Sequence, residues 1–369
     1  EEFKEKVIKE MMDVIMLLPM EAEIFQEEHN PAIASLKKYS GEQKMYNFTP
    51  IYLFAFLVSF LICIPICRAI IPALRKRAAQ PIYEGGPAWH TAKCGTPTLG
   101  GISFIISISL ACLLVCLILF KSGLSDIALS VLSILIFSVA NSFVGLIDDL
   151  TKLMRKRNKG LSPLQKLIFQ LFLAILFLIA RHKLLGYGTE IVVADTTLDL
   201  GVAYYPLSVF FLLGIINCAN LTDGIDGLAT CVSATMGVCI FLISAFAFSD
   251  AAIISAALAG GALAFMKFNI NPAKIFMGDT GSLFLGAVAA SVVFCLGNPF
   301  LSMLFGGIYV IEGCSVILQV LSFKTRKKRV LLMAPLHHHL EKRGWSESKI
   351  CSVAMLITLS LSIPAYMLI

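Results

Sequence analysis

The chain has 369 residues, of which 57% are hydrophobic and only 15% are charged, and its mean hydropathy is +0.83. Soluble domains contain roughly 45–50% apolar and about 25% charged residues. The composition therefore excludes a soluble globular protein, a disordered chain, a collagen-like fibre and a disulfide-stapled secreted module. The net charge of +6 is too small to indicate nucleic-acid binding. These values predict an all-α polytopic membrane protein.

The first 48 residues differ in composition from the rest of the chain. They are rich in Glu and Lys, and their apolar stretch at residues 14–18 is too short for a signal peptide. We interpret residues 1–48 as an amphipathic or loosely ordered extension. Residues 49–369 are expected to form one transmembrane domain.

Ten apolar runs follow, and most of them approach the roughly 17–25 residues that a helix needs to cross a bilayer. They lie at residues 51–72, 99–120, 127–147, 165–180, 204–217, 228–248, 251–266, 282–297, 299–321 and 350–368. The ninth run contains Gly306, Gly307 and Glu312, so we expect that helix to be bent or broken. Residues 190–200, between the fourth and fifth runs, have the pattern of a small hairpin.

Basic residues are unequally divided among the nine connections between these runs. The odd-numbered connections, counted together with Lys166 at the start of the fourth run, contain 20 Lys and Arg residues, whereas the even-numbered connections contain three. Because cytoplasmic loops are enriched in Lys and Arg, we predict cytoplasmic odd connections, extracytoplasmic termini and an outer hairpin. The 11 cysteines fall mostly inside apolar runs without Cys-x-x-Cys spacing, which predicts small apolar side chains rather than metal ligands.

The polar motifs all fall at the ends of the runs predicted to be cytoplasmic. They are Lys-Cys-Gly-Thr-Pro-Thr-Leu-Gly-Gly at 93–101, Asp-Asp at 148–149, Asn-Leu-Thr-Asp-Gly-Ile-Asp-Gly at 220–227, Phe-Met-Gly-Asp-Thr-Gly-Ser at 276–282 and Met-Ala-Pro-Leu-His-His-His-Leu-Glu at 333–341. This distribution predicts an active site on the cytoplasmic face.

Five aspartates at this face, at positions 148, 149, 223, 226 and 279, would repel one another unless a cation neutralised them. Carboxylate oxygens suit Mg²⁺, which binds proteins through one or two carboxylates together with substrate phosphates. Glycines such as Gly278 and Gly281 permit close backbone approach to phosphate, and Lys93 and Lys152 supply positive charge. A helix cap or a simple turn is the alternative explanation for any one of these residues.

The three consecutive histidines, His337, His338 and His339, cannot all bind one metal from a regular helix, because adjacent side chains point about 100° apart. We expect an irregular loop, or only one or two acting residues. We interpret them as phosphate or substrate contacts, with a hydrogen-bonded loop stabiliser as the alternative.

Together these motifs, in this order over residues 51–369, resemble the signatures of the polyprenyl-phosphate N-acetylhexosamine-1-phosphate transferases. Within that superfamily the sequence is most similar to the branch that uses phospho-MurNAc-pentapeptide. The resemblance implies a ten-helix enzyme of the bacterial inner membrane, commonly a homodimer. It would transfer phospho-MurNAc-pentapeptide from its UDP conjugate to undecaprenyl phosphate with Mg²⁺, forming lipid I and UMP for peptidoglycan synthesis.

The resemblance also implies roles for individual residues. Asp279 would be the principal Mg²⁺ ligand, Asp148 the base and Asp149 its partner, with Lys93 and His337 also catalytic. The implied substrate-binding residues are Lys93, Thr98, Lys152, Asn217, Asn220, Asp223, Asp226, Phe276 (stacked on uracil), Gly278, Gln319, His337, His338 and His339.

Direct attack by the acceptor phosphate is the favoured mechanism, because its second pKa of about 6 leaves it largely ionised at neutral pH. The rival is a covalent phosphosugar on Asp148. Two other functions compete with this one. In the first, the donor is UDP-GlcNAc; the histidine segment argues against it, because the GlcNAc branch of the superfamily has a different histidine loop. A secondary transporter is suggested by Glu312 and the short runs, although transport would require polar groups at both faces.

Overall fold

A computed structural model describes residues 49–77, 93, 95–155, 160–194, 196–246 and 250–369. Within these ranges, ten helices are long and apolar enough to cross a membrane. They are α3 (Thr49–Arg77), α4 (Gly101–Lys121), α5 (Ser125–Arg155), α6 (Pro163–Leu184), α7 (Tyr204–Thr222), α8 (Leu228–Phe246), α9 (Asp250–Asn269), α10 (Gly278–Ser291) continued by the 3₁₀ helix η3 (Val292–Leu296), α12 (Gly307–Arg326) and α14 (Glu347–Met367). The ten predicted spans are confirmed. The extension predicted for residues 1–48 lies outside the described residues.

Local sequence signals explain where several helices begin. Ser162 accepts a hydrogen bond from Gln165 N, and the Gln165 side chain accepts one from Ser162 N, so a capping box followed by Pro163 starts α6. Ser346 caps α14 in the same way by accepting from Lys349 N. These caps fix where the segments between helices join the bundle.

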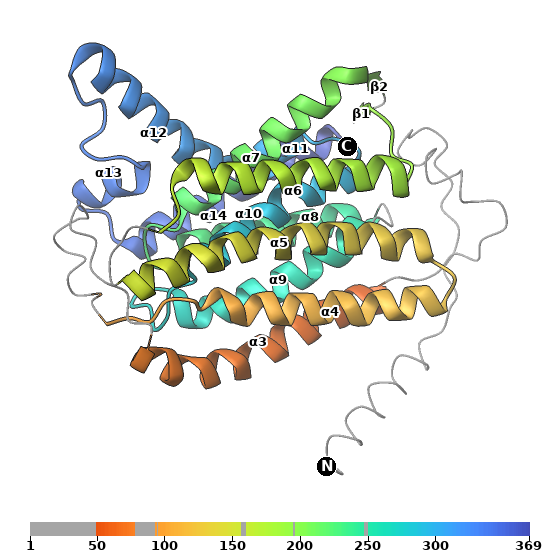
Figure 1. Cartoon of the computed structure of the whole chain (residues 1–369), viewed down its shortest axis with the longest axis horizontal. Helices are drawn as coiled ribbons and strands as arrows, with labels where there is room; N and C mark the ends of the chain where they lie inside the picture. Colours follow the sequence, from red (N-terminus) through yellow and green to blue (C-terminus); the bar gives the residue numbers. More distant parts are fainter. Residues whose placement is uncertain (1–48, 78–92, 94, 156–159, 195, 247–249) are drawn as a thin grey trace, which may run out of the picture.

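The ninth span is interrupted, as the sequence predicts. The short helix α11 (Leu301–Phe305) ends at Gly306, and α12 begins at Gly307. Beyond the break α12 runs outward from the bundle (Figure 1). The chain then returns through the short helix α13 (Leu336–Lys342) to α14.

The centre of the bundle is formed by α9 and α10, whose residues are buried almost throughout. Small residues bring their neighbours close: a Cβ on Gly260 would clash with the Phe56 backbone, and one on Gly101 with Gly281. Such small-residue contacts are typical of helix packing in membranes, where apolar burial alone gives little selectivity. The cysteines that the structure describes are all free, and most are buried.

The two ends of the bundle differ. At one end, β1 (Glu190–Val193) and β2 (Thr196–Asp199) form an antiparallel pair, followed by the 3₁₀ turn η2 (Gly201–Ala203). Ala194 N donates to Leu368 O, and Asn298 Nδ2 to Val192 O, so this pair lies beside the C-terminus and the segment after the 3₁₀ helix η3 (Val292–Leu296). Figure 1 shows α13 at the opposite end. The membrane side that each end faces stays a prediction.

Candidate active site

Three aspartates meet at the end of the bundle opposite the hairpin. One carboxylate oxygen of Asp148, one of Asp149 and one of Asp279 all lie within 4.8 Å of one another. The two helices that carry them, α5 and α10, approach closely at Gly145, where a Cβ would clash with the Asp279 backbone. We call these three residues the carboxylate cluster.

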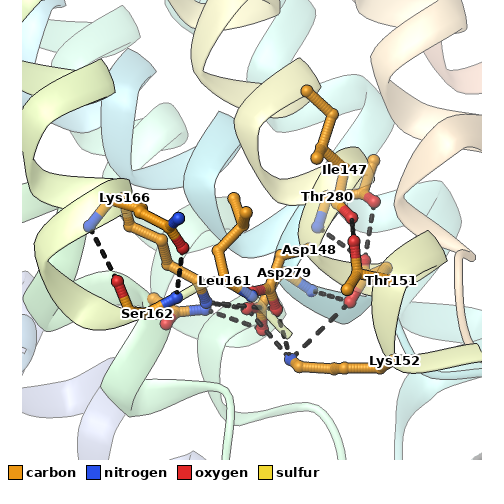
Figure 2. Close-up of polar contacts among 12 residues, drawn as sticks. Ile147, Asp148, Thr151, Lys152, Leu161, Ser162, Lys166, Asp279 and Thr280 are labelled. Carbon is orange, nitrogen blue, oxygen red and sulfur yellow. Dashed lines mark hydrogen bonds and ion pairs between the residues drawn. The ribbon is translucent and has the colours of Figure 1, made fainter. Parts of the chain in front are cut away.

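Two lysines bind this cluster from different helices (Figure 2). Lys152 Nζ lies 2.6 Å from Asp148 Oδ2 and 3.1 Å from Asp279 Oδ2. Lys166 Nζ, on α6, lies 3.1 Å and 2.5 Å from the same two oxygens. Three carboxylates are therefore countered by only two ammonium groups, so the cluster holds one more acidic than basic side chain.

Asp149 has a different set of partners. Its Oδ1 accepts from Asp279 N at 3.1 Å, and its Oδ2 accepts from Thr280 N at 2.9 Å and Thr280 Oγ1 at 2.6 Å. Because the first N–H groups of a helix lack partners within it, Asp149 caps α10 from a neighbouring helix. The sequence prediction treats Asp149 as a partner of the base, whereas the geometry gives it this capping contact.

Gly160 and Leu161, which precede α6, lie against Asp148. Leu161 N donates to Asp148 Oδ1 at 2.7 Å, and a Cβ on Gly160 would clash with the same carboxylate. Both oxygens of Asp148 are thus engaged, one by a backbone amide and the other by two lysines.

The remaining neighbours of the cluster come from the predicted motifs. Asn220 Nδ2 donates to Asp279 Oδ1 at 3.2 Å and to Ser282 Oγ at 2.7 Å. Gly278 has a positive φ of 72°, and an added Cβ there would be 2.6 Å from Asp149 Oδ2 and 2.8 Å from Thr98 Oγ1. Four predicted substrate-binding residues, Lys152, Asn220, Gly278 and Thr98, therefore lie at this cluster.

Backbone pairing joins the two segments that flank the cluster. Phe276 N donates to Pro97 O, and Gly100 N donates back to Phe276 O, both at 2.8 Å. This pairing fixes the backbone of the half-buried Phe276 beside the segment that carries Thr98.

A second charged group lies at the same end of the bundle. Lys93 Nζ is 2.7 Å from Asp226 Oδ1 and 2.8 Å from Glu347 Oε1. Burial alone would lower the pKa of Lys93, but hydrogen bonds and charge attraction from Asp226 and Glu347 raise it above its usual range. We call Lys93, Asp226 and Glu347 the Lys93 cluster.

The carboxyl group of Asp223 is affected by charges from both clusters. Burial, followed by the charges of Asp279, Asp149 and Asp226, raises the pKa of its half-buried carboxyl to about 8. The Asp223 carboxyl is therefore largely protonated at neutral pH and adds little negative charge to this end of the bundle.

The three histidines lie on a regular helix, α13, and not in an irregular loop. His337 is buried with its ring against Gly224, and its backbone N–H donates to Glu312 Oε1 at 3.1 Å. Its Nδ1 is 3.2 Å from Glu312 Oε2 without hydrogen-bond alignment. The His338 ring lies against that of His337, with centroids 4.2 Å apart, and its Nδ1 is 2.6 Å from Glu341 Oε2. His339 Nδ1 accepts from Leu332 N at 3.0 Å.

Two predicted site residues contact other groups. Asn217 Nδ2 donates to Gln170 Oε1 at 2.7 Å, which joins α7 to α6. Gln319 Oε1 accepts from Val330 N and Leu331 N, so it orders the chain after α12. Neither contact involves the carboxylate cluster.

Sequence analysis missed four residues that contact the predicted motifs: Lys166, Thr280, Glu347 and Glu312 as the anchor of α13. Lys166 is one of the basic residues counted with the third connection and follows the Ser162 cap by one turn, but neither signal indicates a contact with Asp279. For Glu347 the sequence contains no comparable signal, because its partners lie 254 and 121 residues away.

The carboxylate cluster fits a hard divalent cation. All its donor atoms are oxygens, and they lie close enough to share one ion. Oxygen donors favour Mg²⁺, Ca²⁺ or Mn²⁺ over metals that prefer sulfur or imidazole. Lys152 and Lys166 contact the same oxygens, so an ion that binds there would compete with two ammonium groups.

Comparison with known proteins gives a consistent result. Residues 131–297 match the family model described as glycosyl transferase family 4. The phospho-N-acetylmuramoyl-pentapeptide-transferase of Halalkalibacterium halodurans is 41% identical over 304 residues, which cover 81% of this chain and 92% of that protein. The protein of the same name from Bacillus subtilis is also 41% identical, over 81% of this chain and 92% of its own length. The one from Clostridium perfringens strain SM101 is 40% identical over 84% and 94%.

The ten apolar helices and the relatives thus place the chain among multi-pass membrane transferases, and residues 131–297 match the glycosyl transferase family 4 model. Within that class the chain belongs to the phospho-N-acetylmuramoyl-pentapeptide-transferase family.

Proposed function

We propose that this protein transfers phospho-MurNAc-pentapeptide from UDP-MurNAc-pentapeptide to undecaprenyl phosphate, forming lipid I and UMP in a Mg²⁺-dependent reaction. One observation carries the proposal: three carboxylates within 4.8 Å, faced by two lysines, lie at one end of a ten-helix bundle. The identity of about 40% to transferases of that name supports the choice of substrates.

The reaction requires that end of the bundle to face the cytoplasm of a bacterial inner membrane. The acceptor phosphate lies in the headgroup layer, and the nucleotide donor is cytosolic. A helix-end site satisfies both requirements, and the 20 basic residues in the odd connections support the same orientation, with both termini outside. We further propose a homodimer, as is common in the superfamily.

In this proposal Asp279 is the principal Mg²⁺ ligand, with Asp148 beside it. The bound cation would neutralise charge that develops on the donor diphosphate. Lys152 and Lys166 are the cationic side chains at the reacting phosphates, because their ammonium groups already lie among the three carboxylates.

The donor's nucleotide would bind beyond Asp223, toward the Lys93 cluster. Phe276 offers a half-buried ring for stacking against uracil. Lys93 and Asp226 provide a donor and an acceptor for polar recognition, and His337 closes the site at Gly224.

We propose direct transfer. An oxygen of the lipid phosphate forms a bond to the sugar-bearing phosphorus, while the bond joining that phosphorus to UMP breaks. The acceptor is mostly dianionic at neutral pH, since its second pKa is about 6, so Asp148 needs to accept a proton only from the remaining monoanion. Both oxygens of Asp148 are already hydrogen-bonded or ion-paired, which supports direct attack over a covalent intermediate on this carboxylate.

The test uses the purified protein with undecaprenyl phosphate and Mg²⁺. Either UDP-MurNAc-pentapeptide or UDP-GlcNAc is added as the donor, and UMP release is measured. We expect release only with the pentapeptide donor. Release only with UDP-GlcNAc would assign the other donor, and no release from either would contradict the proposal. A phosphosugar adduct trapped on Asp148 without acceptor would contradict direct transfer. Glu312 gives no support to a transport function, because its carboxylate anchors the His337 backbone.

A further inference from the structure

Glu347 lies outside every motif that resembles the superfamily, yet its carboxylate joins two of them. It is the first residue of α14, where the Ser346 cap fixes the start of the helix. Glu347 Oε1 and Oε2 lie 2.8 Å and 2.9 Å from Lys93 Nζ. Its Oε2 also accepts from Asp226 N at 2.8 Å. One side chain therefore holds both a charged side chain and a backbone amide.

These contacts connect three distant parts of the chain. Lys93 precedes α4, Asp226 lies between α7 and α8, and Glu347 begins α14. Asp226 in turn accepts from Ala273 N at 2.9 Å through Oδ2, which brings in the segment before α10. The side chain of Glu347 is 12% exposed and that of Lys93 is 19% exposed, so water only partly screens their attraction.

The arrangement limits the positions that Lys93 can adopt. A lysine side chain has large rotamer freedom, and ordering it on substrate binding costs free energy. Two carboxylates that hold the ammonium in advance reduce this cost. Asp226 alone can pair with Lys93, but Glu347 also fixes the backbone that carries Asp226.

We infer that Glu347 is a positioning residue, which preorganises Lys93 and the Asp226 segment for the nucleotide donor. This inference rests on the proposed function, in which Lys93 and Asp226 contact the donor. Glu347 itself is not a reacting group, since its contacts are with protein atoms. Its loss should therefore weaken donor binding and leave the chemical step and the lipid acceptor largely unaffected.

The test compares Glu347→Gln, Lys93→Gln and the double variant in the UMP-release assay. The amide oxygen of Glu347→Gln can still accept from Asp226 N, so this variant removes mainly the ion pair with Lys93. We expect a rise of about 10-fold in the donor KM, which corresponds to about 1.4 kcal/mol. The kcat and the acceptor KM should stay within about threefold. The double variant should be no worse than Lys93→Gln alone, because contacting residues are not additive.

Two further variants make the test specific. Lys349→Gln changes a charge in the same helix turn, where the ammonium lies 4.2 Å from the Trp345 ring centre, and should leave all constants within about twofold. Glu347→Asp keeps the negative charge and should recover part of the lost donor affinity. Thermal unfolding of every variant shows whether the fold is retained.

An unchanged donor KM in Glu347→Gln, additive effects in the double variant, or no recovery in Glu347→Asp would overturn the inference. These results are distinguishable from failure of the proposed function, because if the proposed function is wrong the wild-type protein itself releases no UMP from the pentapeptide donor.

Discussion

The carboxylate of Asp149 holds the first turn of α10 through Thr280, accepting from both its backbone N–H and its hydroxyl. Asp279 immediately precedes Thr280, so the same contact sets the position of the proposed metal ligand. Within the acidic pair, Asp148 faces the two lysines, and Asp149 faces the α10 backbone. Two adjacent aspartates thus have separate physical roles.

This separation predicts different consequences for stability. Asp149→Ala leaves the buried N–H groups of α10 without their acceptor, which should cost about 1–3 kcal/mol of stability in addition to activity. Asp279→Asn keeps the side-chain shape and the helix cap, so its unfolding temperature should stay near that of the wild type. Thermal unfolding in detergent measures both. Equal stability of the two variants would contradict the capping role.

Lys166 is predicted to be as necessary as Lys152. Lys166→Gln removes one of two ammonium groups that face Asp148 and Asp279, so the excess negative charge would repel the donor diphosphate. We expect kcat/KM to fall by roughly 100-fold or more, the scale for loss of an electrostatic contact to a transition state. Lys183→Gln, at an exposed position on the same helix, is the matched control. Similar activity of the two variants would remove Lys166 from the site.

Gly145 tests the close approach of α5 to α10. A Cβ at this position would overlap the backbone of Asp279, so Gly145→Ala must push the two helices apart. Overpacking of this kind typically costs about 1–3 kcal/mol, and it would also separate Asp148 from Asp279. Gly214→Ala adds the same methyl group on α7, where no neighbouring atom lies within 4 Å. We expect loss of stability and turnover in the first variant only, measured by thermal unfolding and UMP release.

Asp223 predicts a pH dependence of stability. Its pKa in the folded protein is about 8, above the unfolded value of about 3.9. A raised folded-state pKa means that folding favours the protonated form, so this contribution to stability is full below about pH 4, falls progressively as the pH rises, and is lost above about 8. Asp223→Asn should lack this loss. Unfolding temperatures measured in EDTA from pH 6 to pH 9 should therefore fall more steeply for the wild type, and parallel curves would refute the assignment.

The sequence predicts the spans well because the bilayer imposes one simple rule on apolar length. It also predicts the break at Gly306 and Gly307, since consecutive glycines and an acidic residue weaken a helix locally. The sequence also predicts that the aspartates lie near one another, because their motifs all fall at the same ends of the predicted helices.

The sequence does not predict which side chains finally touch. Lys166 and Asp279 are 113 residues apart and meet only because α6 packs against α5, which in turn packs against α10. Gln319 instead contacts the backbone after α12, and the histidines lie on a helix, because tertiary packing decides both. Long-range contacts of this kind depend on helix geometry that no local pattern contains.

The account's central claim is that the carboxylate cluster is a Mg²⁺-dependent centre for phosphosugar transfer. UMP release from UDP-MurNAc-pentapeptide, measured for the wild type and Asp279→Asn across a Mg²⁺ titration, tests it most directly. The account predicts release that equals the amount of lipid product, requires Mg²⁺ and falls by roughly 1,000-fold in a correctly folded Asp279→Asn variant. Near-normal turnover by that variant, or turnover in EDTA, would contradict the claim.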